Sequence, residues 1–450
     1  GIAHLPSLFY VAILLLPFVF GIIITIEGYW GGYSLMAAIV AAGLSINFWH
    51  SFLMIPLAAY DKYLELQEKR LSIKYYPSLT VIVPAYNEEK VIARTIEALL
   101  DAEYPDKEII VVDDGSTDGT LNIALRYEKL GVKVLHKENG GKYSALNYGL
   151  RAARGDIVVV VDADTIVGRK ALKAMAMKFR EPDVAAVCGN IKVLNRVNWL
   201  TKCQALEYVL GINIVRRALS NFGAVPVVPG SLGAFRRSVL ETVGFYDKDT
   251  VVEDFDVTIK VLKAGRSIQA SSEALAYTEA PQTFRDFYKQ RMRWYGGNLQ
   301  TIIKHKDALF NPRYGFLQRL SYPYVLVSLV FIPFASVVVW IAAAYAIIAG
   351  EGALIALIFS IFTTMQFLLS LLALEIDEED LKLMLYSPFF VIGYKNLIDF
   401  FKIKSMLDIV LRRRVKWMRA ERIGYAEAII RKRRTNSTTL HLSSLLGYFQ

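Results

Sequence analysis

Cysteine is nearly absent from this sequence: Cys188 and Cys203 are the only two in 450 residues. Two thiols cannot build a disulfide framework, so nothing indicates an oxidising compartment and we expect both thiols to stay reduced. No glycine-rich dinucleotide fingerprint follows the first expected strand, and the Gly-Gly-Lys turn at residues 140–142 lacks the spacing of a P-loop. No internal repeat occurs, and no arrangement of basic and aromatic residues indicates a nucleic-acid partner.

Hydrophobic residues are abundant instead, at 54% of the chain, which exceeds the roughly 45–50% of an ordinary soluble domain. Charged residues make up 21% of the chain and gather in its middle third. The composition therefore predicts a membrane protein whose apolar parts are interrupted by a sizeable soluble domain.

Two apolar stretches near the start are each long enough to cross a bilayer, which takes about 20 residues. They cover residues 8–26 and 35–59, with a short turn between them, and predict a transmembrane hairpin. A signal peptide is the competing interpretation of the first stretch, but it lacks a basic leading segment and a second span follows at once. Basic residues begin just after the second stretch, so the positive-inside rule assigns the following domain to the cytoplasm. They are Lys62, Lys69, Arg70 and Lys74.

Two further spans are expected after the soluble part, at residues 324–348 and 353–374. The next apolar segment, residues 383–401, contains Lys395 and Asp399. Each central charge costs ~2.5–3.5 kcal/mol, which nearly cancels the gain from the apolar residues around it. We therefore expect an interfacial or re-entrant segment, which keeps the C-terminal tail in the cytoplasm.

That tail is strongly basic. Between Lys402 and Arg434 stand twelve lysines and arginines against three acids, which is nearly the whole excess of a chain with net charge +10. Such a run beside an apolar segment is typical of binding to anionic lipid headgroups, and a solvated basic helix is an equally good interpretation. From Thr435 onward the residues are polar and without pattern, which predicts disorder.

Residues 77–311 have the pattern of a soluble α/β domain. Short runs rich in β-branched residues predict parallel strands buried on both faces, and helical stretches alternate with them as in a doubly wound sheet. The expected strands are 79–83, 109–112, 132–135 and 157–161, and the expected helices are 89–100, 119–130 and 143–153.

Acids or polar loops follow three of these expected strands. Ligands of an open parallel sheet bind beyond the carboxyl ends of its strands, where these residues emerge together. Asp162 and Asp164 are the pair that indicates a cation site most strongly, because clustered carboxylates repel one another unless a cation is bound. Asp118 or Glu89 alone is equally well explained by capping of the next helix. Lys142, after two glycines, offers a positive charge to a diphosphate near that cation.

Six short motifs follow one another between residues 83 and 294. They are Val83-Pro-Ala-Tyr-Asn-Glu88, Asp113-Asp-Gly-Ser-Thr-Asp118, Gly140-Gly-Lys142, Asp162-Ala-Asp164, Val252-Glu-Asp254 and Gln290-Arg-Met-Arg-Trp294. In this order they resemble the motifs of the inverting family 2 glycosyltransferases with the GT-A fold. The likeness covers residues 77–300 and is greatest to the membrane-integrated branch that holds the cellulose, chitin, hyaluronan and poly-N-acetylglucosamine synthases. It implies an α/β GT-A domain, Rossmann-like with a mostly parallel sheet, inserted between N- and C-terminal transmembrane helices.

The resemblance also implies roles for individual residues. Asp254 would be the general base that deprotonates an acceptor hydroxyl, and the charge of Glu253 beside it could raise its pKa. Capping of a helix that begins near Phe255 is compatible with that role. The nucleotide sugar would bind at Pro84, Tyr86, Glu88, Asp113, Asp114, Lys142 and Asp162, Mg²⁺ or Mn²⁺ at Asp162 and Asp164, and the acceptor at Gly230, Ser231, Gln290, Arg293 and Trp294.

The last motif falls on an expected amphipathic helix, residues 284–306. At 100° per residue Phe284, Tyr288 and Tyr295 share one face, and the motif residues lie on another. We expect the helix to lie in the membrane interface with its motif directed to the transferase site, where the tryptophan stacks on a sugar and the second arginine meets phosphate. An interfacial tryptophan beside a snorkelling arginine is the alternative.

The favoured function is an inverting transferase in the plasma membrane that uses a nucleotide-diphosphate sugar, first of all a UDP-sugar, and extends a β-linked polysaccharide through its own spans. An oligomer or an export partner would complete a thin channel. The rivals are an enzyme that glycosylates a lipid once and a non-catalytic nucleotide-sugar sensor, which the presence of all expected acids disfavours. The expected parts are a transmembrane hairpin (1–60), a linker helix (61–76), the GT-A domain (77–283), interface helices (284–318), a second transmembrane region (319–403) and the basic tail (404–450).

Overall fold

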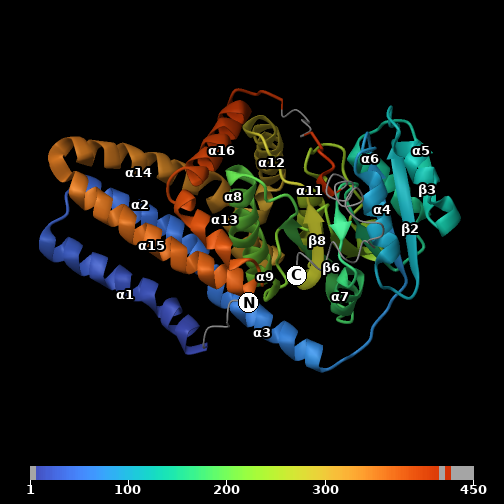
Figure 1. Ribbon diagram of the computed structural model, residues 1–450, viewed down its shortest axis with the longest axis horizontal. Helices are drawn as coiled ribbons and strands as arrows, with labels where there is room; N and C mark the ends of the chain where they lie inside the picture. The colour runs from blue at the N-terminus through green and yellow to red at the C-terminus, as the bar shows by residue number, and fades with distance from the viewer. Residues whose placement is uncertain (1–6, 415–420, 427–450) are drawn as a thin grey trace, which may run out of the picture.

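The computed structural model describes residues 7–414 and 421–426. Figure 1 shows long helices side by side on the left and a β-sheet with its covering helices on the right. The long helices are α1 (Ser7–Gly31), α2 (Leu35–Phe52), α14 (Ile332–Ala346) and α15 (Gly352–Ile376). Between the two parts lie α3 (Met54–Arg70), α8 (Trp199–Glu207), α9 (Ile214–Ser220), α12 (Phe284–Lys304), α13 (Tyr322–Leu326) and α16 (Tyr394–Val410).

One sheet of eight strands forms the framework of the right-hand part, in the order β3-β2-β1-β4-β7-β6-β8-β5. The pairs β1·β2, β1·β4, β2·β3 and β6·β8 are parallel, whereas β7 and β5 are antiparallel to their neighbours. The mostly parallel sheet predicted from the sequence is therefore confirmed. The strands are β1 (Leu79–Ala85), β2 (Lys107–Asp114), β3 (Lys133–Lys137), β4 (Ile157–Val160), β5 (Ile166–Val167), β6 (Val184–Val193), β7 (Gly233–Arg236) and β8 (Ser267–Thr278).

Burial of the strands follows their position in the sheet. β1, β4 and β6 are buried along their whole length, because each has a neighbouring strand on both sides. β3 was expected to be buried on both faces, and that expectation is wrong: it is an edge strand whose side chains are only partly buried. β5, β6, β7 and β8 were not predicted, because these strands are short or contain alanine, serine and glycine.

Helices cover both faces of this sheet. The three expected from the sequence appear as α4 (Ile92–Asp101), α5 (Thr120–Leu125) with a 3₁₀ turn at Glu128–Leu130, and α6 (Lys142–Ala152). The others on this part are α7 (Ala171–Lys178), α10 (Arg237–Thr242) and α11 (Glu253–Lys263).

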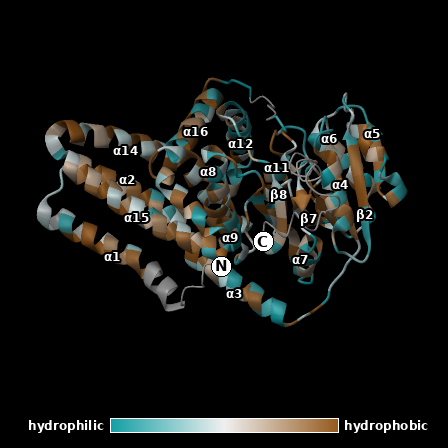
Figure 2. Cartoon of the chain, in the orientation of Figure 1, coloured by the Kyte–Doolittle hydropathy of each residue, from teal (hydrophilic) through white to brown (hydrophobic). Residues whose placement is uncertain are grey.

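Two helical runs of the described chain, Leu35–Arg70 and Leu317–Ile376, are long and apolar enough to cross a membrane by length and composition. The second is broken at Gly350, whose φ of 92° lies in the left-handed region, so the chain reverses there and α14 and α15 both pack against α2 (Figure 1). Figure 2 shows that these helices are brown over most of their length. Phe334, Val338 and Ile341 on α14 are each more than half exposed, as a surface in contact with lipid would be.

The segment 383–401 does not form one helix. A 3₁₀ segment, Leu381–Phe390, precedes Gly393, whose φ is 112°, and α16 begins only at Tyr394. α16 then packs along α12, where the ring centroids of Phe401 and Tyr288 are 5.4 Å apart. Part of the aromatic face expected on α12 is therefore covered by α16.

Buried polar contacts join the end of α15 to the sheet. Asp377 accepts hydrogen bonds from Asn190 at 3.0 Å and from Lys192 at 2.7 Å, both on β6. Two residues further on, Glu379 forms a bidentate pair with Arg196 at 2.7 and 2.8 Å. Because both carboxylates are almost completely buried, these contacts fix the sheet rigidly to the long helices.

Candidate functional site

The loops after β1 and β2 hold each other in place at the carboxyl edge of the sheet. The side-chain oxygen of Asn87 accepts a hydrogen bond from the backbone N–H of Thr117 at 2.8 Å, and the backbone N–H of Asn87 donates to the hydroxyl of Ser116 at 3.0 Å. Glu89 and Asp118 serve the same loops: Glu89 Oε2 accepts from the N–H of Gly119, and Asp118 Oδ1 from that of Thr120 at the start of α5. Asp118 therefore has the local contact at the start of the next helix that was one of its two interpretations. Glu89 does not cap the helix that follows it, α4, and instead holds the loop before α5.

Asp113 and Asp114 at the end of β2 face different ways. Asp114 accepts from the N–H groups of Gly140 and Gly141 at 3.0 and 2.9 Å, and so shapes the turn before Lys142. Asp113 is fully buried and bonds His136 at 2.7 Å. Asp113 does not line either of the two cavities described below, whereas Asp114 does.

A cavity of about 550 Å³ opens beyond these strand ends, and we call it the sheet-edge cavity. It collects residues from three consecutive strand ends and from the turn before α6, as expected for an open parallel sheet. Its polar lining includes Tyr86, Glu88, Asp114, Asn139, Lys142 and Asp164, and Pro84 lies beside them.

A second cavity of about 500 Å³, the helix cavity, runs from the same edge toward the long helices. Asp254, Gly230, Ser231 and Trp294 line it, together with residues from α2, α14, α15 and α16. Asp254 and Trp294 line only this cavity, whereas Tyr86 and Glu88 line only the sheet-edge cavity. The expected base and the expected nucleotide contacts therefore lie in adjoining chambers.

The two cavities share one wall, which brings together acids far apart in the sequence. Asp164 and Asp254 both line the helix cavity, so the strand-end acids and the expected base share one space. The residues that line both cavities include Lys142, Asp162, Asp164, Glu253, Gln290 and Arg293.

Lys142 is the central cation of this shared wall. Its ammonium lies 2.8 Å from Asp162 and 2.7 Å from Glu253. Gly230 leaves the room for it, because a Cβ at that position would lie 2.7 Å from Lys142 Nζ and 3.4 Å from Asp162 Oδ1. Burial disfavours the ammonium, but the carboxylates of Asp162, Glu253 and Asp254 outweigh it and raise the pKa of Lys142.

The pKa values of two acids in the site, Asp162 and Asp254, are shifted in opposite directions. Burial opposes ionisation of Asp162, but the charges of Lys142, Arg422 and Arg293 outweigh it and lower the pKa of this carboxyl. Burial and the nearby carboxylate of Glu253 raise the pKa of Asp254, against the attraction of Lys142. A carboxylate with a raised pKa is a better proton acceptor, which is the property a general base needs.

Asp254 is oriented by the backbone at the start of α11. Its Oδ1 accepts from the N–H of Phe255 at 2.8 Å, and its Oδ2 accepts from the N–H of Gly230 at 3.4 Å. The helix was expected to begin near Phe255 with Asp254 as its cap, and that expectation is wrong: α11 begins at Glu253 with Val252 at the capping position, so Asp254 lies in the first turn. Its carboxylate lines the helix cavity.

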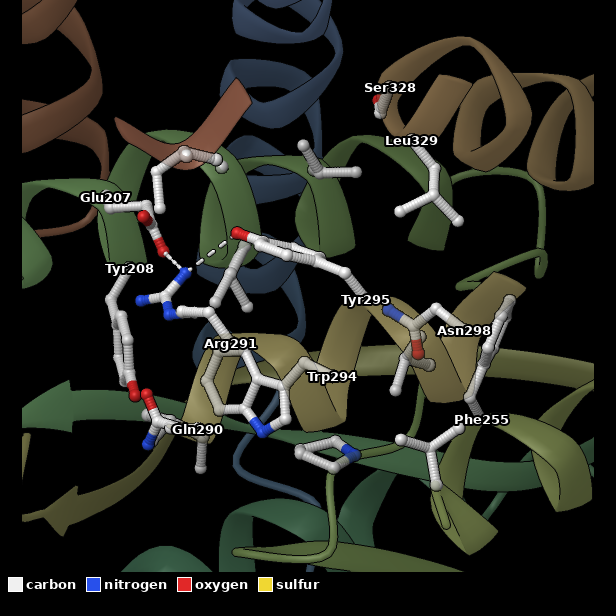
Figure 3. Close-up of a pocket in the computed structure, with 18 of the residues that line it drawn as sticks. Glu207, Tyr208, Phe255, Gln290, Arg291, Trp294, Tyr295, Asn298, Ser328 and Leu329 are labelled. Carbon is white, nitrogen blue, oxygen red and sulfur yellow. Dashed lines mark hydrogen bonds and ion pairs between the residues drawn. The ribbon is translucent and has the colours of Figure 1, made fainter. Parts of the chain in front are cut away.

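Arg291 is a buried residue on α12 that was not predicted to belong to the site, and it holds Trp294 of the motif in position. Figure 3 shows the guanidinium of Arg291 between Glu207, with which it forms an ion pair, and the hydroxyl of Tyr295 at 3.2 Å. It also stacks on Trp294, with its guanidinium carbon 4.6 Å from the ring centroid. The indole is therefore held in place in the wall of the helix cavity. The signal available in the sequence was the spacing of four residues between Arg291 and Tyr295, which puts both on one helix face.

Arg422 is a second residue that the sequence reasoning missed. Its guanidinium lies 3.0 Å from Asp164, and Glu279 holds the same segment by accepting from the N–H groups of Ile423 and Tyr425. This part of the basic tail therefore lies over the carboxyl edge of the sheet, not at a lipid surface. Nothing local in a run of arginines and lysines marks one of them for this position. The predictions made for residues 415–420 and for the tail beyond residue 426 concern parts of the chain outside the described residues.

Asp162 and Asp164 fit a hard divalent cation by their chemistry. Both offer carboxylate oxygens to the space where the cavities meet, and Mg²⁺ or Mn²⁺ bound to phosphates commonly uses one or two such ligands. Another acidic cluster, Asp247, Asp249 and Asp256, has its oxygens close together. There Lys304 already fills the centre, with its ammonium 2.9–3.0 Å from all three carboxylates.

Comparison with known proteins agrees with this architecture. The family model described as glycosyl transferase family 2 matches residues 80–244. Poly-beta-1,6-N-acetyl-D-glucosamine synthase of Staphylococcus epidermidis is 33% identical over 229 residues, which are 50% of this chain and 56% of that protein. The synthase of the same name from Staphylococcus aureus (strain COL) is 32% identical over 237 residues, 52% of this chain and 58% of that protein. The chain thus spans little more than half the length of the curated relatives it matches.

A solved structure shares the fold. The mannosyltransferase PcManGT from Pyrobaculum calidifontis, in complex with GDP-Man and Mn²⁺, superposes with a TM-score of 0.62 over 84% of this chain and all of its own, at 23% identity. The residues matched by the family model, 80–244, include β2, β4 and all but the first residue of β1, and the ends of these three strands form the sheet-edge cavity. Residues 80–244 therefore match the model of glycosyl transferase family 2, and the sheet shares the GT-A fold of the solved structure.

Proposed function

We propose that this chain is an inverting glycosyltransferase that moves a sugar from a nucleotide-diphosphate sugar, a UDP-sugar in the first place, to a growing β-linked polysaccharide. The observation that carries the proposal is the shared wall, where Lys142 and the strand-end acids lie between one chamber for a donor and one for an acceptor. The identity to poly-N-acetylglucosamine synthases supports the polysaccharide product.

The donor would lie in the sheet-edge cavity. Glu88 and Asp114 line it and offer acceptors to the N–H groups of a base or the hydroxyls of a ribose, and Tyr86 offers a ring. Lys142 and Arg293 would meet the diphosphate at the shared wall. Asp162 and Asp164 would hold Mg²⁺ or Mn²⁺, which when bound neutralises charge on the leaving diphosphate.

Asp254 would take the proton of the attacking hydroxyl. The acceptor hydroxyl approaches from the helix cavity, on the side opposite the leaving diphosphate, so the configuration at the anomeric carbon inverts. A positioned base contributes about 10²–10⁴-fold to such a step. Trp294, held by Arg291, would stack on the acceptor sugar.

The long helices would lie in the plasma membrane with the sheet in the cytoplasm. The exposed apolar side chains on α14 support contact with lipid, and the basic residues that follow Ala59 support the orientation. Continuity of the helix cavity with these helices supports passage of the polymer through them, with a second copy or an export partner completing the path.

A single transfer to a lipid is the second candidate, because apolar side chains such as Leu329 and Ile332 form part of the helix cavity. Purified protein supplied with UDP- and GDP-sugars and Mn²⁺ would decide by the size of its product. A polymer supports the synthase, and one sugar on a lipid supports the alternative. Asp254→Asn with unchanged release of UDP would remove Asp254 as the base and refute the mechanism.

A further inference from the structure

Two glycines line the helix cavity, and they differ in the space around them. A Cβ at Gly230 would lie 2.7 Å from Lys142 Nζ. A Cβ at Gly211 would lie at an ordinary contact distance, 3.8 Å, from Cγ of Glu207. Apart from the adjoining residues and the backbone of its own helix, it would meet nothing else within 4 Å in the described chain. Crowding therefore explains the glycine at position 230 but not the glycine at position 211.

Backbone conformation does not require the second glycine either. Gly211 lies in a π-helical turn, Tyr208–Asn213, that continues α8 into α9. It is not among the residues with positive φ, so any L-residue could adopt its conformation. Glycine inside a helix is less stable than alanine, because its unfolded backbone has more freedom to lose. In the described chain this glycine destabilises the helix without a packing or conformational reason.

The π-helical turn lies where the sheet meets the long helices. It packs against β6 on one side and α15 on the other, and Gly211 is exposed at the cavity surface. Asp254 lines the cavity at the edge of the sheet, whereas Asn47 and Gln366 line it from α2 and α15. π-helical turns within α-helices are frequent at functional sites. A molecule that extends from Asp254 to the long helices therefore has to pass this turn.

The lining of the cavity fits a sugar chain in that position. Trp294, Tyr295 and Tyr324 offer aromatic rings on which sugar rings stack, and Asn298 offers an amide for their hydroxyls. A ring can lie flat on a helix backbone only where no side chain intervenes. We propose that the growing polysaccharide lies against the bare backbone of Gly211, and that the missing side chain there sets the length of the product.

This inference rests on the proposed function, of which it names a residue that controls product length. A larger side chain at position 211 would narrow the passage and oppose each advance of the sugar chain after a transfer. The sugar chain would then leave the enzyme after fewer transfers. Donor binding is not expected to change, because Gly211 does not line the sheet-edge cavity.

Gly211→Leu tests the inference in the full chain, held in nanodiscs and supplied with UDP-N-acetylglucosamine and Mn²⁺. We expect its product to be about tenfold shorter or more on a sizing gel, since extra methylene groups in a filled pocket have effects of that scale. Binding of UDP with Mn²⁺, measured by calorimetry, should equal that of the parent protein. A product of parental length overturns the inference.

Gly211→Ala separates a role in the passage from a structural role. Alanine favours the helix, so the variant should melt about 1–3 °C above the parent protein and still make a shorter product. A lower Tm would show that the turn itself needs glycine, and it would overturn the inference. If Gly211→Leu does not fold, the product of Gly211→Ala decides.

Gly352→Leu is the matched control. Gly352 begins α15 with helical φ and ψ, a Cβ there would meet nothing nearer than 4.0 Å in the described chain, and it lines neither cavity. Its product should have parental length, and equal shortening in both leucine variants would overturn the inference. A parent protein that makes no polymer from any UDP- or GDP-sugar overturns the proposed function as well, whereas a polymer unaffected by Gly211→Leu overturns this inference alone.

Discussion

Gly230→Ala tests whether the position of Lys142 matters for activity. The added Cβ would lie 2.7 Å from Lys142 Nζ, so the ammonium has to withdraw by about 0.7 Å to reach an ordinary contact of 3.4 Å. Its contacts with Asp162 and Glu253, now 2.8 and 2.7 Å, would lengthen beyond good hydrogen-bond geometry. Because the displaced atom is the end of a flexible side chain, we expect little effect on folding.

The expected loss follows from these two contacts. A hydrogen bond between charged groups contributes about 1.5–3 kcal/mol, so losing one of them at the transition state lowers kcat/KM by about 10- to 100-fold. Release of the nucleoside diphosphate from purified protein gives kcat/KM, and a thermal melt of the same preparation gives stability.

Gly31→Ala is the matched control, since a Cβ there meets nothing within 4 Å and Gly31 has no positive φ. It should change neither quantity. The reasoning is refuted if Gly230→Ala keeps kcat/KM within twofold of the parent protein. It is also refuted if the variant loses activity only in proportion to a loss of folded protein.

Three further predictions use other parts of the structure. The two buried cysteines, whose pKa burial raises to about 12, should resist N-ethylmaleimide in the folded protein and react in denaturant; rapid labelling of the native chain would contradict their burial. Burial alone would raise the pKa of Glu379, but the ion pairs with Arg196 and Lys192 outweigh it and lower this pKa to about 2. The carboxylate therefore contributes fully to stability above its usual pKa of 4.5, and this contribution is lost as the pH falls toward 2. Glu379→Gln should therefore lower the free energy of unfolding by about 2–3 kcal/mol at neutral pH, with a difference in Tm from the parent that shrinks in acid; an equal difference at all pH values would argue against the ion pair. Glu253→Gln removes a charge that raises the pKa of Asp254, so the acidic limb of the kcat profile should move to lower pH, and a shift to higher pH would exclude that coupling.

The regular part of the fold could be predicted because its signals are local. β1, β2 and β4 are continuous runs of β-branched residues, and the acids that follow them had to emerge at one edge once the strands were parallel. The meeting of Asp164 with Asp254 could be inferred only through the resemblance to a family, because 90 residues separate them and no periodicity relates them.

The remainder depends on tertiary contacts that leave no mark in a single sequence. Arg422 is one of many cations in a basic run, and only the fold brings it to Asp164. Arg291 and Arg293 look equivalent in the motif, yet one is buried against Glu207 and the other lines both cavities. The helical wheel of α12 could not reveal that α16 packs against Tyr288, nor that Tyr295 lines the helix cavity together with Trp294 of the motif.

The ammonium of Lys304 among three carboxylates has a consequence for counting ions. The ammonium fills the space between the three carboxylates in which a divalent cation would otherwise bind, and its charge neutralises part of theirs. A manganese titration followed by electron paramagnetic resonance should therefore give a stoichiometry near one per polypeptide, although the described chain holds two acidic clusters. The internal cation ties the helix that bears Asp254 to the helix that bears Trp294, and no fluctuation in metal supply can loosen that link.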